Sequence, residues 1–201
     1  MSLIDRVKNI IINPVKEWNV IALETTDNSK IIIGYVLPLA GAAAIAAFIG
    51  YGLIGVNTGF SRITGTNWGL YYALNILIAA IAGVFICGFI IDALAPSFGS
   101  EKNIGRSIQL VAYSYTPVWI GGLLSILPAI ALVGNLFGLY GLYLLYLGIP
   151  KLKKTPEDKV IAYYVVSLVV IIVVYRVIGL IITRLMMPAF GLSFGRVLDV
   201  G

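Results

Sequence analysis

Four long apolar blocks constrain what this chain can fold into: residues 31–56, 68–94, 108–149 and 160–187. A hydrocarbon core of about 30 Å takes roughly 20 apolar residues of α-helix, so each block is long enough to cross a bilayer. As one helix, the third block would extend for about 63 Å, which is the length of two crossings. We expect a tight turn between them, in residues 128–134. The blocks therefore predict an all-α membrane bundle of five transmembrane helices, with approximate spans at residues 31–56, 68–94, 108–127, 131–149 and 160–187.

The composition leaves lipid as the solvent for most of the surface. Charged residues make up 11% of the chain and hydrophobic residues 60%, whereas about a quarter of the residues of a soluble domain are charged. Such a chain cannot cover its own surface with polar groups. We therefore expect a multi-pass integral membrane protein, with residues 30–187 forming the transmembrane domain.

The residues of common catalytic sites are scarce. Histidine is absent, which removes the commonest general base and the commonest metal ligand. The single cysteine, Cys87, lies in an apolar block and has no partner for an internal disulfide. The sequence contains no phosphate-binding loop, metal-ligand cluster or nucleophile with an evident base. We therefore expect a protein that is not an enzyme, holds no cofactor or metal and binds no nucleic acid.

The basic residues are divided unequally between the two sets of loops. With five crossings, ten Lys and Arg residues fall on one side: Arg6, Lys8, Lys16, Lys30, Lys102, Arg106, Lys151, Lys153, Lys154 and Lys159. Three fall on the other side: Arg62, Arg184 and Arg196. Because cytoplasmic loops collect Lys and Arg, we expect the N-terminus inside the cell and the C-terminus outside. The expected location is a prokaryotic cytoplasmic (inner) membrane.

Residues 1–29 have the pattern of short amphipathic helices. Five apolar residues recur at helical spacing: Leu3, Ile4, Val7, Ile10 and Ile11. Asn13-Pro14 is typical of a helix cap followed by a first-turn proline and predicts a second short helix through Glu24. Two placements are open: the helices lie in the membrane interface with Trp18 at headgroup level, or they pack on the cytoplasmic ends of the bundle. For the tail, residues 188–201, the sequence predicts no structure.

The third helix contains a polar run, AYSYTPVW at residues 112–119, where lipid chains would surround it. Pro117 removes a backbone hydrogen bond and frees a carbonyl near Tyr113. In lipid such a defect persists only where other helices, hydroxyl groups or water satisfy the backbone. Ser114 and Thr116 can bond to carbonyls locally, and Tyr113 or Tyr115 can reach a neighbouring helix. The run predicts either a structural kink that faces the bundle or a polar cavity open to the cytoplasm.

A few polar residues lie in other apolar blocks. Arg176 is about 24 Å from the inner end of the fifth helix. It either faces the bundle, as intramembrane charges usually do, or extends toward the outer surface. Asn75 and Ser125 lie at depths suited to contact it. Asp92 lies near the inner end of the second helix, where we expect it to meet a first-turn amide of a neighbouring helix, or Lys102 or Arg106.

The fourth helix has small residues on one face and tyrosines on the other. Small residues let helices approach closely in lipid, so one face is expected to serve helix packing: Gly134, Gly138, Gly141 and Gly148. The opposite face is expected to meet lipid, a partner subunit or a cavity: Tyr140, Tyr143 and Tyr146.

Two stretches resemble the Yip domain family, the Ypt/Rab-interacting-protein type of membrane proteins, in its prokaryotic branch. They are FGSEKNIGRSIQLVAYSYTPVWIGGLL at residues 98–124 and NPVKEWNVIALE at residues 13–24, and the resemblance covers about Asn13 to Met187. It implies a five-helix bundle with a cytoplasmic N-terminus. Eukaryotic members act in vesicle traffic and bind Rab GTPases, with an Asp-Leu-Tyr-Gly-Pro motif ahead of the first helix. That motif is missing from this sequence, so Rab binding is not expected.

Two classes of function follow. The first is a membrane organiser that binds lipids, other membrane proteins or further copies of itself through its N-terminal helices, basic loops and glycine faces. The second is a small transporter or channel for an ion or a neutral or anionic solute, with a path lined by Tyr113, Ser114, Asn75, Ser125 and Arg176. Lipid scrambling is a third hypothesis, for which the sequence offers no separate signal.

Overall fold

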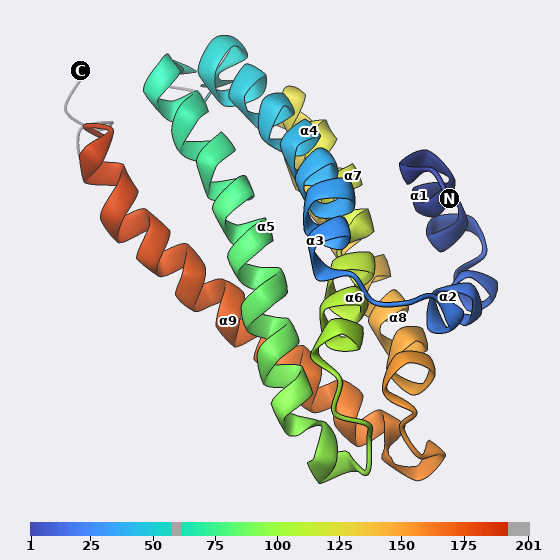
Figure 1. The fold of residues 1–201 in the computed structure, drawn as a ribbon. Helices are drawn as coiled ribbons and strands as arrows, with labels where there is room; N and C mark the ends of the chain where they lie inside the picture. Colours follow the sequence, from blue (N-terminus) through green and yellow to red (C-terminus); the bar gives the residue numbers. More distant parts are fainter. Residues whose placement is uncertain (58–61, 193–201) are drawn as a thin grey trace.

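The computed structural model of the chain describes residues 1–57 and 62–192. Two short helices lie on the flank of a bundle of longer ones (Figure 1). The helices are α1 Leu3–Ile12, α2 Pro14–Leu23, α3 Asn28–Ile31, α4 Leu37–Ala47, α5 Thr66–Leu94, α6 Ile104–Ser114, α7 Thr116–Gly122, α8 Ala131–Lys153 and α9 Val160–Ala189. Between α4 and α5, the two-residue strands β1 Val56–Asn57 and β2 Arg62–Ile63 pair antiparallel.

Turns of other helical types extend several of these helices. Two π-helical turns, Ile32–Val36 and Phe48–Ile54, make α3 and α4 parts of one continuous helical segment. Short 3₁₀ turns border α5, α7, α8 and α9, at Ala95–Phe98, Leu123–Ile126, Pro128–Ile130 and Glu157–Lys159.

Four segments of the described chain are long and apolar enough to cross a membrane: Asn28–Ile54, Thr66–Phe98, Pro128–Lys153 and Glu157–Ala189. They coincide, within a few residues at each end, with the first, second, fourth and fifth predicted spans. The turn expected in residues 128–134 is centred slightly earlier, because the 3₁₀ turn at Pro128 already leads into α8.

Residues 108–127 form a helical segment that is interrupted where the polar run predicted either a kink or a polar cavity. Helix α6 ends at Ser114, and α7 begins at Thr116 after a break at Tyr115. Pro117 causes this break because it has no amide hydrogen to continue the helix. The two short helices still lie inside the bundle, since α6 packs against α5 and α8, and α7 against α4 and α8.

The glycine face of α8 packs against helices of the same chain. A methyl group added at Gly134 would overlap the carbonyl oxygen of Gly121 in α7, and one at Gly141 would lie 2.7 Å from that of Ser114 in α6. A methyl group added at Gly148 would likewise lie too close to Leu110 and to the Trp18 ring. Only at Gly138 would the added carbon meet an ordinary contact, 3.9 Å from Val118. This face is therefore already covered and is not free to bind a second copy of the chain.

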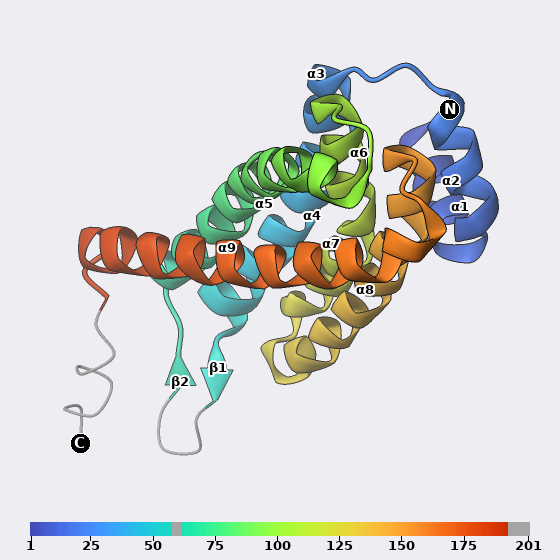
Figure 2. The ribbon, with the colours of Figure 1, turned by 90° about the horizontal axis from the view of Figure 1, so that it is seen from below.

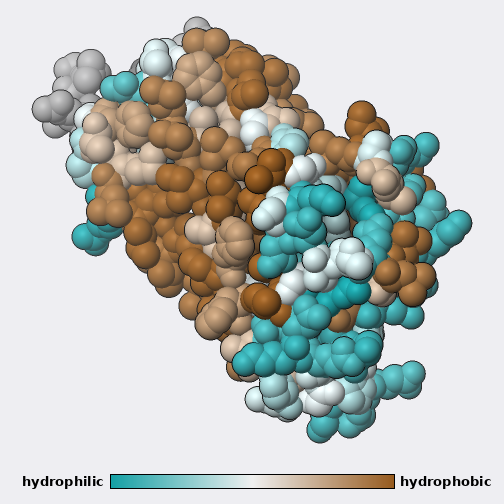
Figure 3. All heavy atoms as spheres, in the orientation of Figure 1, coloured by the Kyte–Doolittle hydropathy of each residue, from teal (hydrophilic) through white to brown (hydrophobic). Residues whose placement is uncertain are grey.

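The surface divides into an apolar part and a polar part (Figure 3). Hydrophilic residues gather over α1 and α2 and over the loops that join α5 to α6 and α8 to α9, which together we term the polar end. Elsewhere large apolar side chains are exposed, among them Leu132, Leu180 and Leu185. Helix α9 runs obliquely across the bundle, against α5 and α8 (Figure 2). Lipid is the natural solvent for this apolar surface.

The close contact of α8 with α7 predicts an asymmetric response to small substitutions. Gly134→Ala should lower stability by about 1–3 kcal/mol, because the new methyl group overlaps backbone that cannot move aside. Gly138→Ala is the matched control; it should leave stability unchanged or slightly raised, since alanine favours helix. Thermal unfolding of the purified proteins in detergent measures both. Equal melting temperatures for the two variants would contradict the packing described.

Candidate functional site at the polar end

A hydroxyl group satisfies the carbonyl that Pro117 leaves without a backbone hydrogen bond. The Thr116 hydroxyl donates a hydrogen bond of 2.7 Å to the Tyr113 carbonyl. The same Thr116 oxygen lies 2.7 Å from the hydroxyl of Tyr35, which comes from the first π-helical turn of the chain. Since Thr116 uses its proton on the carbonyl, Tyr35 is the donor in the second bond. The break between α6 and α7 is thereby tied to the first transmembrane segment.

Arg6 fixes α1 and α2 against this break. Its guanidinium is buried, forms an ion pair of 2.5 Å with Glu17 of α2, and forms a second with Glu24. It also lies over the ring of Tyr113, 5.4 Å from the centroid, in cation–π contact. Burial alone would lower the pKa of Arg6, but Glu24, Tyr113 and Glu17 together raise it above its ordinary value, so the group stays charged.

Trp18 does not lie at headgroup level, as one of the two placements required. It is fully buried in the core, against Gly148 of α8 and edge-on to Tyr113. Three further hydrogen bonds, from two side chains, hold the helix pair in place. The Tyr140 hydroxyl of α8 donates a hydrogen bond of 2.7 Å to the Ile11 carbonyl near the end of α1. The Arg106 guanidinium of α6 donates hydrogen bonds to the Ile21 and Ala22 carbonyls near the end of α2.

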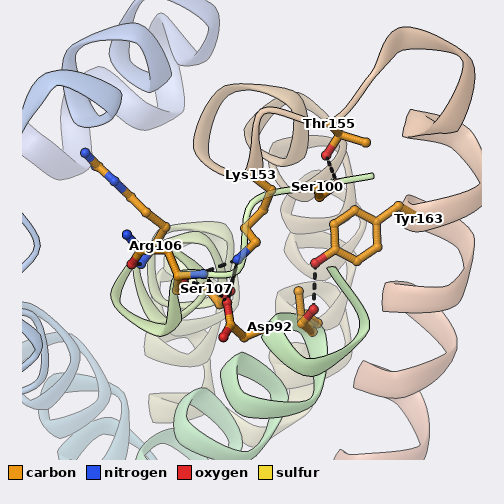
Figure 4. A network of polar contacts seen from close by, with 9 residues as sticks. Asp92, Ser100, Arg106, Ser107, Lys153, Thr155 and Tyr163 are labelled. Atoms are coloured by element: carbon orange, nitrogen blue, oxygen red, sulfur yellow. Dashed lines mark hydrogen bonds and ion pairs between the residues drawn. The ribbon is translucent and has the colours of Figure 1, made fainter. Parts of the chain in front are cut away.

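A second ionic network joins α5, α6 and α8 at the polar end (Figure 4). The Lys153 ammonium lies 2.6 Å from the Asp92 carboxylate and donates to the Ser107 hydroxyl at 2.8 Å. The same carboxylate accepts bonds from the Ser107 hydroxyl and from the amide of Asn103, the residue that caps α6. Lys153 is fully buried and Asp92 nearly so. The network therefore supports the structure, because each charge has a partner and hydrogen bonds.

Of the three partners expected for Asp92, the two basic residues were wrong, but an amide at the start of a neighbouring helix, that of Asn103 at the N-cap of α6, does bind Asp92. Neither Lys102 nor Arg106 contacts it: Lys102 is exposed, and Arg106 binds the end of α2. Lys153 takes their place because α8 continues past Pro150 and brings its last residue beside α5. Arg6, Glu17 and Lys153 were not among the candidates. For Arg6 and Glu17 one signal was available, since they precede the buried Ile10 and Ile21 by four residues and so share their helix faces.

The polar residues proposed to line a path are divided among three cavities. The largest, about 710 Å³, lies at the polar end and includes Arg6, Glu24, Tyr35 and Tyr113. Ser114 and Arg176 line a second cavity of about 400 Å³. Asn75 and Ser125 line a third, of about 320 Å³. No residue lines both the first cavity and either of the others.

This division weakens the transport hypothesis, because Tyr113 is not in one cavity with Ser114 and Arg176. The second and third cavities do share a wall, in which the rings of Tyr115 and Tyr175 stack with centroids 4.8 Å apart. Arg176 does not point into a packed interior; its side chain is exposed at the edge of the second cavity. Asn75 and Ser125 lie in a different cavity from Arg176.

Within residues 1–57 and 62–192, no group of three or more His, Cys, Asp or Glu side chains could hold a metal ion. The buried charged groups of the polar end are instead paired, in networks that join helices. The fold and this site define a multi-pass α-helical membrane protein whose N-terminal helices are fixed to the bundle by buried ion pairs.

This chain belongs to the Yip1 domain family, whose model matches residues 8–181. It is 29% identical over 171 residues to the inner membrane protein YohC of Escherichia coli strain K12, covering 83% of this chain and 88% of that protein. The same values hold for YohC of Escherichia coli O6:H1 strain CFT073. No solved structure matches. The resemblance seen in the two sequence stretches is thus confirmed, and the relatives' names agree with an inner-membrane location.

The buried pair of Asp92 and Lys153 predicts a large loss of stability when one partner is removed. Lys153→Met should lower the free energy of unfolding by about 3–5 kcal/mol, because it leaves a buried carboxylate without its cation. Adding Asp92→Asn should recover much of this loss, since the amide oxygen still accepts from Asn103 and Ser107. Thermal unfolding in detergent measures the double-mutant cycle.

Lys154→Met is the control for this cycle. Lys154 pairs with Glu101 on the exposed surface, where a salt bridge is worth about 0–1 kcal/mol. A loss for Lys153→Met no larger than for Lys154→Met would contradict the structural role of the buried pair.

Proposed function

We infer that this protein is a non-enzymatic organiser in the cytoplasmic (inner) membrane, which holds a lipid surface or a membrane-protein partner on its α1–α2 pair. The N-terminus lies in the cytoplasm, as the positive-inside distribution of Lys and Arg favours. The chain crosses the membrane five times, with α6 and α7 together as the third crossing. The placement of these two helices against α5, α4 and α8 supports this count.

The observation that carries the proposal is the outer face of α1 and α2. Their inner face is buried and holds the Arg6 network, whereas large apolar side chains point away from the bundle: Ile4 is 76% exposed, Ile12 61% and Leu23 89%. Exposed lysines, Lys8 and Lys16, lie on the same two helices. Apolar residues interspersed with Lys are the composition of a helix that lies on an anionic membrane surface or against a partner.

The helix pair is presented rigidly. The ion pairs of Arg6, the Tyr140 bond to α1 and the Arg106 bonds to α2 connect it to α6 and α8. A docking surface that is held in advance loses less conformational freedom when a partner binds. The absence of Histidine and the pairing of the buried charges favour binding over chemistry as the role of this end.

Site-specific photo-crosslinking in native membranes tests the proposal. A photoreactive amino acid at Ile4, Ile12 or Leu23 should give discrete adducts with a protein or with lipid headgroups. The same residue at Leu132 or Leu180, which are 77% and 66% exposed on the transmembrane helices, should give adducts with acyl chains only. Mass spectrometry of the adducts separates a protein partner from a lipid surface. If the α1–α2 positions react only with water or with the acyl chains seen at the control positions, the proposal is wrong.

A further inference from the structure

Arg176 is a charge near the middle of a transmembrane helix. It lies about 24 Å along α9 from Val160 and about 20 Å from Ala189. Its side chain is exposed and makes no ion pair or hydrogen bond with any residue in the described part of the chain. A charge at this depth is costly, and intramembrane charges usually have a partner or line a functional site. The part of the chain that the structure describes supplies no such partner, which leaves the guanidinium open to a counter-charge from outside it.

The cavity beside Arg176 has the character of a site for a slender amphipathic ligand. Its walls are mainly apolar and include Leu142 and Leu145 of α8 and Ile171 and Ile172 of α9. Its volume, about 400 Å³, is in the range of small-molecule sites, which combine apolar walls with a few polar groups.

Two further polar residues line the same cavity. Asn135 lies about 27 Å along α8 from Lys153, a height similar to that of Arg176 on α9. Ser114 lies nearer the polar end; it is 2% exposed, and among the described residues its hydroxyl has no hydrogen-bond partner. A buried hydroxyl without a partner is uncommon and calls for an explanation. The cavity thus has a cation and an amide at one height and an unused hydroxyl farther along.

We propose that this cavity binds a single-chain amphiphile with a carboxylate head, of the fatty-acid class. The carboxylate pairs with the Arg176 guanidinium, which can bind both of its oxygens at once, and accepts from the Asn135 amide. The chain extends along Leu142 and Leu145 toward Ser114. The charges balance, because one cation meets one singly charged head.

The shape and charge of the site select this class over others. An α-helix with side chains is about 10 Å wide, so 400 Å³ would hold only about one turn of a partner helix. The described residues of a second copy supply no matching acid, since the acids of residues 28–192 are Asp92, Glu101, Glu157 and Asp158, all at the polar end. A phosphate monoester carries about −1.5 to −2 charges, which one Arg cannot neutralise.

The test uses the full-length protein in lipid nanodiscs and a photoactivatable palmitic acid as the probe. The expected result is labelling of peptides from α8 and α9 that unlabelled palmitate competes away. Arg176→Gln should weaken labelling about tenfold, because a charge-assisted hydrogen-bonded pair is lost. Arg184→Gln is the matched control; Arg184 is an exposed arginine of the same helix that does not line the cavity, so labelling should not change.

A second variant fills the site without removing charge. Gly138→Leu has room for its first carbon, directs a bulky side chain at the cavity and strengthens the helix, so the protein should fold and lose labelling. Three results would overturn the proposal. They are equal labelling of wild type and Arg176→Gln, equal labelling by photoactivatable hexadecanol, and a co-purifying transmembrane protein that crosslinks at Ile172 in place of the fatty acid.

Discussion

One unsatisfied carbonyl in a membrane-embedded helix organises much of this structure. Pro117 cannot donate to the backbone, and no water is available in a hydrocarbon core to compensate. Thr116 donates to the Tyr113 carbonyl and accepts a hydrogen bond from Tyr35, so the defect ties α6 and α7 to the first transmembrane segment. The Tyr113 ring, held beside the break, forms a cation–π contact with Arg6 and so positions α1 and α2. A local backbone requirement thereby determines where the N-terminal helices lie.

The ionic groups of the chain follow a simple division of space. Two networks, around Arg6 and around Lys153, lie at the polar end and connect elements that are distant in sequence. Some of the closest contacts between the other helices are made by small residues, such as Gly121 against Gly134 and Gly52 against Gly69. In lipid the hydrophobic effect does not draw helices together, so association depends on close backbone approach and on polar bonds. This protein uses close backbone approach in the apolar part and polar bonds where water is near.

The sequence predicted those features that depend on local pattern. The apolar blocks placed four of the spans, and Pro117 with its neighbouring hydroxyls predicted both the freed Tyr113 carbonyl and the Thr116 bond. Features that depend on pairing across the chain were not predictable in this way. Asp92 and Lys153 are 61 residues apart, and Lys153 is indistinguishable in sequence from the solvent-exposed Lys154 beside it. Trp18 suits a membrane interface as well as a core, and only the fold of α2 onto Gly148 decides between them.

The long separation of Asp92 from Lys153 also sets an order on biosynthesis. A ribosome adding about 5–20 residues per second reaches Lys153 roughly 3–12 s after Asp92, and 61 residues separate the two. During that interval the carboxylate has no cation, so the end of α5 must remain hydrated at the membrane surface. Only when α8 has entered the bilayer can the pair form and α5 settle to its final depth. The ion pair therefore forms late, after the helices that it joins have been inserted.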